Sequence, residues 1–144
     1  MELNAYLVFN GKCREAFTFY ERCLGGKIEA IMTVGESPMA EQAPPDQRNN
    51  VIHARMVVDG KVLMGSDAPA AMYEEPKGFS VAITVDDPGR AERLFNELAQ
   101  GGSIRMPLQQ TFWSPRFGML VDRFGIPWMI SCSPEAQPSE KERS

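Results

Sequence analysis

The residues best suited to chemistry are one histidine and one arginine near the middle of the chain. His53 is the single histidine among 144 residues, so one copy of the chain cannot hold a metal ion on several histidines. Arg55 follows two residues later, in an apolar run that ends at Asp59 and Gly60. Asp-Gly between two apolar runs is typical of a two-residue β-hairpin, because both turn residues adopt positive φ. We therefore expect His53 and Arg55 on one face of a strand.

The hairpin turn also predicts which side chains face these two residues. Counting back from the turn places Arg55 opposite Met64 and His53 opposite Ser66. Two roles stay open for His53: a structural residue of the strand, or a group that binds a ligand or transfers a proton. Asp67 ends the second strand of the hairpin, and we expect it to cap a turn rather than to act as an acid.

A second candidate region is rich in aromatic residues. Residues 112–130 contain both tryptophans and three of the eight phenylalanines. Trp113 stands before a predicted turn that includes Arg116, so an indole and a guanidinium could close over a ligand there. Packing of Trp113 against a partner subunit is the alternative. Trp128 alternates with Met129, so if Met129 faces a cleft, Trp128 faces the core.

Composition and charge narrow the function. The chain is 43% hydrophobic and 24% charged, which suits one globular domain. The formal charge of -4 argues against binding to nucleic acid or to an anionic membrane, which takes clustered basic residues. We see no basic leader, and no apolar run approaches the length of ~20 residues that a membrane span needs. We expect a cytoplasmic protein whose partner is a small molecule or a protein.

The three cysteines do not suggest a disulfide or a reactive thiol. Cys13, Cys23 and Cys132 are odd in number and form no C-x-x-C pair. No base or cation is specified beside any of them. We therefore expect all three to be reduced and to act as small buried apolar residues.

The chain repeats itself. An alternating strand pattern, an amphipathic helix pattern and a Gly-Gly pair follow one another twice, and residues 5–28 lie on residues 81–104 without a gap. We call the shift that carries residue 5 onto residue 81 the repeat offset. An internal duplication would explain this repeat, and chance similarity of two such units is the alternative. A long loop is expected at residues 35–50, which hold three prolines. Each copy is predicted to be strand-helix-strand-strand-strand.

The repeat predicts an α+β fold of two βαβββ modules, whose curved mixed sheets pair around a cleft. The helix of each module would cover one face of its sheet, and the mixed polar face, which includes Tyr6 and Ser80, would line the cleft. We expect a single domain with module one at residues 1–68, a linker at 69–78, module two at 79–133 and a flexible tail at 134–144.

Several segments together resemble a known family. They are Tyr6 to Gly11, Glu15 to Tyr20, Leu24 to Gly26, Phe112-Trp113, Arg116 to Gly118 and Asp122 to Gly125. In this order and spacing they resemble the PhnB-like branch of the glyoxalase/bleomycin-resistance/dioxygenase, or vicinal oxygen chelate, superfamily. The resemblance implies paired βαβββ modules, a cleft between their sheets and a homodimer. It also makes the segment beginning at Asp122 a structural turn.

The resemblance also suggests where a metal would be held. Metal-dependent members of the superfamily hold a divalent ion on His and Glu side chains from four strands. The matching positions here are Asn4 or Ala5, Ser80, Met64 and Met129. None of these is a good ligand for a divalent ion. We therefore expect no cofactor, and a divalent metal held by nonstandard ligands is the alternative.

Three hypotheses about function follow. The first is a small-molecule-binding protein without the usual metal site. The second is a metal-dependent lyase or dioxygenase of the glyoxalase type, and the third is an interaction module without a ligand. A SAM methyltransferase is not expected, because the sequence lacks a G-x-G-x-x-G motif between a strand and a helix. The expected binding residues are Tyr6, His53, Arg55, Met64, Ser80, Trp113, Arg116 and Met129.

Overall fold

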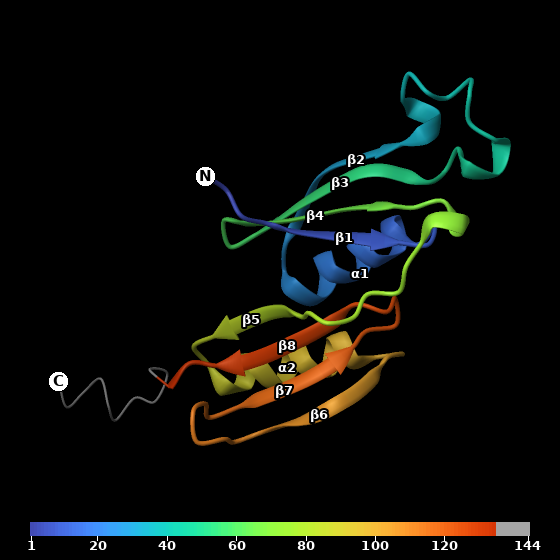
Figure 1. The fold of residues 1–144 in the computed structure, drawn as a ribbon. Coiled ribbons are helices and arrows are strands. Elements are labelled where there is room, and N and C mark those ends of the chain that lie inside the picture. Colours follow the sequence, from blue (N-terminus) through green and yellow to red (C-terminus); the bar gives the residue numbers. More distant parts are fainter. Residues whose placement is uncertain (135–144) are drawn as a thin grey trace. The chain divides into compact units, whose positions relative to one another are not determined.

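The computed structural model describes residues 1–134 and divides the chain into two compact units between Glu75 and Pro76. Each unit is a four-stranded mixed sheet with one long helix, in the order βαβββ (Figure 1). This confirms the predicted α+β fold of two similar modules. The boundary lies inside the predicted linker. The predicted tail, apart from Pro134, lies outside the described residues.

Unit 1 is built from five regular elements. These are β1 (Ala5–Phe9), α1 (Cys13–Leu24), β2 (Lys27–Thr33), β3 (Val51–Val58) and β4 (Lys61–Asp67). The strand order across the sheet is β1-β4-β3-β2, with β1 parallel to β4 and the other pairs antiparallel. β1 and β4, the first and last strands of unit 1, are therefore neighbours in its sheet. Their pairing brings the predicted site residues of this unit onto adjacent strands.

Unit 2 repeats the same arrangement. Its elements are β5 (Val81–Val85), α2 (Pro88–Ala99), β6 (Ser103–Gln109), β7 (Phe117–Val121) and β8 (Pro127–Cys132), and its strand order is β5-β8-β7-β6. The shift that carries the start of β1 onto the start of β5 also carries the start of β2 onto the start of β6. The repeat offset found in the sequence is therefore an offset between equivalent strands.

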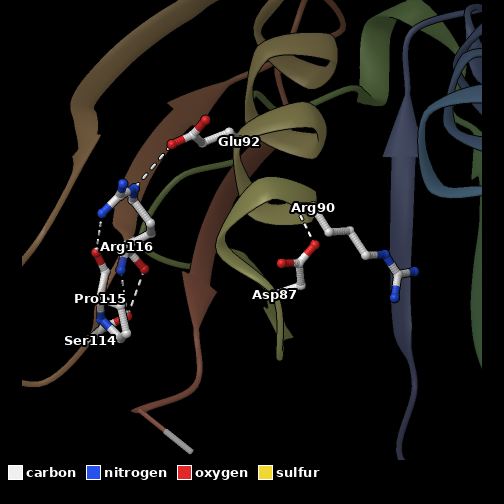
Figure 2. Close-up of polar contacts among 6 residues, drawn as sticks. All are labelled: Asp87, Arg90, Glu92, Ser114, Pro115 and Arg116. Carbon is white, nitrogen blue, oxygen red and sulfur yellow. Dashed lines mark hydrogen bonds and ion pairs between the residues drawn. The ribbon is translucent and has the colours of Figure 1, made fainter. Parts of the chain in front are cut away.

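The helix ends follow from local sequence. The Asp87 carboxylate accepts a hydrogen bond of 3.1 Å from the backbone N–H of Arg90, and Pro88 starts α2, as predicted (Figure 2). α1 ends at Gly25, whose φ of 70° is left-handed and costs glycine little. Gly101 has a φ of 75° at the matching place after α2. No helix within residues 1–134 is long and apolar enough to span a membrane.

Each helix buries its apolar stripe on one face of its own sheet. In unit 1 the largest buried side chains are Leu7, Phe9, Phe17, Tyr20 and Met56. In unit 2 they are Leu98, Leu120, Ile126, Trp128 and Ile130. The three cysteines are buried and form no disulfide, which agrees with their expected apolar role. Each sheet therefore has one face covered by its helix and one face that the unit itself leaves uncovered.

The turn between β3 and β4 fixes the strand register. Asp59 and Gly60 have φ values of 49° and 75°, and the β3–β4 ladder pairs Arg55 with Met64. The ladder stops one pair before His53 and Ser66. The predicted pairing of Arg55 with Met64 is therefore confirmed, whereas that of His53 with Ser66 stays a prediction.

Candidate functional site

A row of three predicted site residues crosses the uncovered face of the unit 1 sheet. Tyr6 on β1 pairs with Met64 on β4, and Met64 pairs with Arg55 on β3. Residues that lie directly opposite each other share a face of the sheet. Leu7, the next residue along β1, is buried on the α1 side. We call the surface that carries Tyr6, Met64 and Arg55, away from α1, the open face of unit 1.

His53 joins this row through a ring contact. The ring centroids of Tyr6 and His53 lie 6.4 Å apart, with an angle of 36° between the ring planes. His53 is half-buried, whereas Tyr6 is 46% exposed and Met32 on β2 is 47% exposed. The structure thus brings together four predicted residues from β1, β3 and β4. They form a partly exposed surface of aromatic and apolar groups with one arginine at its edge.

Arg55 already has a partner at the edge of this face. Its Nε lies 3.0 Å from an Oε of Glu29 on β2, and both side chains are substantially exposed. Water screens such a pair, so separating it costs only about 0–1 kcal/mol. Arg55 is therefore positioned by Glu29 but can turn to another carboxylate or carbonyl oxygen.

The equivalent row in unit 2 contains three methionine thioethers and one alanine. Ala82, Met129, Met119 and Met106 pair in turn across β5, β8, β7 and β6. The repeat offset relates Ala82 to Tyr6 and Met106 to Ala30, so the row matches the one in unit 1. We call the surface with Met129 the open face of unit 2. Sequence reasoning missed Met106 and Met119, because the place of Ala30 and Met106 in the two rows follows only from the strand pairing.

Hydroxyl groups lie beside the methionine row. Ser80 directly precedes β5 and is half-buried. One row further along the sheet, Thr84 on β5 and Ser131 on β8 place their hydroxyl oxygens 3.1 Å apart. The open face of unit 2 therefore combines soft apolar contacts with a small hydrogen-bonding group.

Trp113 reaches the open face of unit 2 through Phe117. The two rings lie 5.4 Å apart in an edge-to-face arrangement, and Phe117 is on the same side of β7 as Met119. Trp113 is 48% exposed, and Phe112, which sequence reasoning missed, is 98% exposed and contacts Trp113 at 4.7 Å. The backbone N–H of Ser114 donates to the hydroxyl of Thr111 over 3.0 Å, which closes the turn.

Arg116 points away from this aromatic group. Its Nε lies 3.1 Å from an Oε of Glu92 on α2, and its Nη1 donates to the carbonyl of Pro115 over 2.8 Å (Figure 2). We expected Arg116 to close over a ligand with Trp113, but the structure places it on the helix side of the sheet. The reason is strand alternation: Phe117 faces the open side, so the residue before it faces α2.

Residues 1–131 match the family described as 3-demethylubiquinone-9 3-methyltransferase. The chain belongs to this family. Protein YjdN of Escherichia coli K12 is a relative with 34% identity over 139 residues, which cover 91% of this chain and 95% of YjdN.

Solved structures agree with this assignment. Protein PA1353 of Pseudomonas aeruginosa is 48% identical with a TM-score of 0.85, and the match covers 92% of this chain and 98% of PA1353. The PhnB protein of Bacillus cereus is 27% identical with a TM-score of 0.77, over 92% of this chain and 100% of PhnB. A glyoxylase/bleomycin resistance/dioxygenase domain from Frankia sp. EAN1pec, 14% identical with a TM-score of 0.61 over 92% of this chain and 97% of that domain, shares the fold alone. The match to PhnB confirms the PhnB-like resemblance, and the Frankia domain confirms the glyoxalase-type fold.

The positions that match the superfamily's metal ligands do not fit a divalent ion. Met64 and Met129 supply thioethers, Ser80 supplies a hydroxyl and Asn4 supplies an amide. Divalent ions of this kind bind carboxylate, imidazole or thiolate groups. Among residues 1–134, no group of three or more His, Cys, Asp or Glu side chains is arranged around a common point. We therefore derive no step through such an ion.

Proposed function

We propose that the chain binds a small organic molecule on the open faces of its sheets. The supporting observation is the uncovered surface of unit 1, where Tyr6, His53, Met64 and Arg55 lie together on adjacent strands. The Tyr6 and His53 rings would contact a planar, largely apolar group, and the Met64 thioether would adapt to its shape. Arg55 would leave Glu29 to hold a carbonyl or carboxylate oxygen.

Unit 2 is proposed to contribute binding groups of its own. Met129, with its neighbours Met119 and Met106, offers a soft apolar surface, and Ser80 offers a hydroxyl near one end. Trp113 is presented on a closed turn, so binding would order few additional side chains. Arg116, paired with Glu92 beside α2, has no part in this proposal.

Binding is proposed to need no divalent ion, and methyl transfer from SAM is not proposed. The first point is supported by the donor chemistry at the four matching positions, and the second by the lack of a Gly-rich nucleotide motif in the sequence. Elemental analysis of the purified protein tests the first point. A stoichiometric divalent metal would favour a glyoxalase-type lyase or dioxygenase. Calorimetry with SAM tests whether the protein binds this methyl donor.

The binding proposal is tested by a thermal-shift screen with a panel of small metabolites. A ligand of the open face should raise the melting temperature of the wild-type protein, and its affinity should fall in the variants His53→Ala and Arg55→Ala. Arg14→Ala, on the exposed side of α1, is the matched control and should bind as the wild type does. If no metabolite binds, or if all three variants bind equally, the chain is better described as an interaction module.

We also propose a homodimer and a cytoplasmic location. The exposed ring of Phe112 suits a contact with a second copy, and cysteines that form no disulfide suit a reducing compartment. Light scattering coupled to gel filtration measures the mass in solution. A mass near the 16.1 kDa of one chain would rule out the dimer.

A further inference from the structure

The connection between the second and third strands differs most between the two units. In unit 1 it runs from residue 34 to residue 50, between β2 and β3. In unit 2 the same connection runs only from residue 110 to residue 116, between β6 and β7. Since unit 2 forms the same sheet with a connection less than half as long, the greater length is not needed for the fold. Long connections of this kind are usually either functional or disordered.

The long connection is a folded structure with its ends fastened together. The backbone N–H of Val34 donates to the carbonyl of Asn50, and that of Gly35 donates to the carbonyl of Arg48, each over 2.8 Å. Ser37 is buried, and its hydroxyl donates to the carbonyl of Val34 over 2.7 Å. Residues 34–36 and 45–47 form short 3-10 helices. This compact loop with adjoining ends resembles the Ω-loops that often carry function.

The loop and the ends of β3 and β4 together line an open, solvent-accessible cavity of about 370 Å³. This is within the usual size range of small-molecule sites, about 300–1,000 Å³. Apolar side chains, including Met39, Pro44 and Ile52, form part of its wall. The cavity lies entirely within unit 1, and none of its lining residues belongs to the open-face group of Tyr6, His53, Arg55 and Met64.

The polar part of the wall has unused hydrogen-bonding capacity. The side-chain amides of Gln42, Gln47 and Asn50 line the cavity, and none of the three makes a hydrogen bond within residues 1–134. Asp67 also lines it, and its two oxygens accept 2.9 Å bonds from the backbone N–H groups of Cys13 and Val51. Each carboxylate oxygen retains a further lone pair.

The charge of the wall limits the kind of molecule that fits. Asp67 is the one ionisable residue among those that line the cavity, and no lysine or arginine is among them. An anion would meet a carboxylate without a balancing cation, which is unfavourable. A molecule with N–H groups would find acceptors in Asp67 and in the carbonyl oxygens of the amides.

We propose that this cavity is a second binding site, separate from the open faces, for a small molecule that joins an apolar body to a neutral or cationic N–H donor group. The apolar body packs against Met39, Pro44 and Ile52. The donor group hydrogen-bonds to Gln47, Asn50 and Asp67. The additional residues of the connection in unit 1 form most of the wall of this site.

Three probes of nearly equal shape test the charge preference. Benzamidine is a cation, benzamide is neutral and benzoate is an anion, and all carry the same ring. Each is titrated into ¹⁵N-labelled full-length protein while the amide signals are followed by NMR. Benzamidine and benzamide should shift the signals of residues 34–50 and 67–69, and benzoate should shift none of them. Equal binding of benzoate, or shifts confined to other residues, would overturn the proposal, as would no shift with any probe.

Variants connect the binding to the wall. Gln47→Leu removes an amide that makes no hydrogen bond in the protein, so the fold should be retained while benzamidine affinity falls about fivefold, as for loss of one hydrogen bond. Gln110→Leu, in the short connection of unit 2, is the matched control and should leave the affinity unchanged. His53→Ala should also leave it unchanged, which separates this site from the open face. Equal affinity of Gln47→Leu and the wild type would contradict the assignment.

Discussion

Asp122 accepts a hydrogen bond of 2.8 Å from the indole N–H of Trp128, and both side chains are buried. The same carboxylate accepts bonds of 2.8 Å and 3.0 Å from the backbone N–H groups of Phe124 and Ile126. One carboxylate thus closes the turn between β7 and β8 and satisfies the only polar group of the largest core side chain. The predicted structural turn and the predicted core tryptophan are parts of one arrangement.

Trp128 and Trp113 should therefore differ strongly as substitution sites. Trp128→Ala should lower the free energy of unfolding by about 3–5 kcal/mol, because a large buried side chain is lost and Asp122 loses a partner. Trp113→Ala should lower it by less than about 1 kcal/mol, since the side chain is half-exposed. Urea denaturation followed by circular dichroism measures both changes. Equal losses would show that the two faces of the unit 2 sheet are assigned wrongly.

Two glycines of unit 2 should respond in opposite directions to alanine. A Cβ at Gly102 would lie against the carbonyl of Val121 and 2.9 Å from the backbone of Asp122, which cannot move aside. Gly102→Ala should therefore destabilise the protein by about 1–3 kcal/mol. A Cβ at Gly89, in the first turn of α2, would meet its neighbours at an ordinary 3.5 Å or more. Gly89→Ala should stabilise the protein by about 0.5–1 kcal/mol, and thermal denaturation compares the two.

The cysteine thiols should be unreactive in the folded protein. Burial, together with the nearby Asp67 carboxylate, raises the pKa of Cys13 to about 12. Burial also raises the pKa of Cys132. At pH 8 the reactive thiolate form of Cys13 is then about one part in ten thousand. Ellman's reagent should label none of the thiols within minutes in buffer and all three in urea. Rapid labelling of Cys13 in buffer would contradict its burial at the start of α1.

Glu36 should titrate below the normal range for a glutamate. The backbone N–H and the hydroxyl of Thr33 donate to its carboxylate over 3.0 Å and 2.9 Å, and these bonds lower its pKa. A lowered pKa means that the contact is complete above the ordinary glutamate pKa and is lost as pH falls through the lowered value. NMR titration of the Thr33 amide signal follows this step. Thr33→Val keeps the N–H but removes the hydroxyl, so the midpoint should move partway back toward the ordinary value.

Much of the fold could be predicted because its signals are local. The helix stripes, the Gly-Gly ends, the Asp59-Gly60 turn and the repeat offset depend on residues close together in the chain or on a simple shift. The same local alternation predicted Trp128 in the core. It also placed Arg55 opposite Met64, because a two-residue turn leaves one register.

Other relationships depend on contacts that no local pattern contains. The sequence by itself determined the elements and the hairpin register, because steric and hydrogen-bonding preferences within a few residues decide them. The shift that relates the two similar units can also be read directly from the chain. Only the tertiary structure decided that Tyr6 meets His53, that Arg116 turns to Glu92 and that residues 34–50 line a cavity beside Asp67. The physical reason is that parallel pairing of β1 with β4, and the folding of a long connection, bring together residues whose separation in the chain carries no periodic signal.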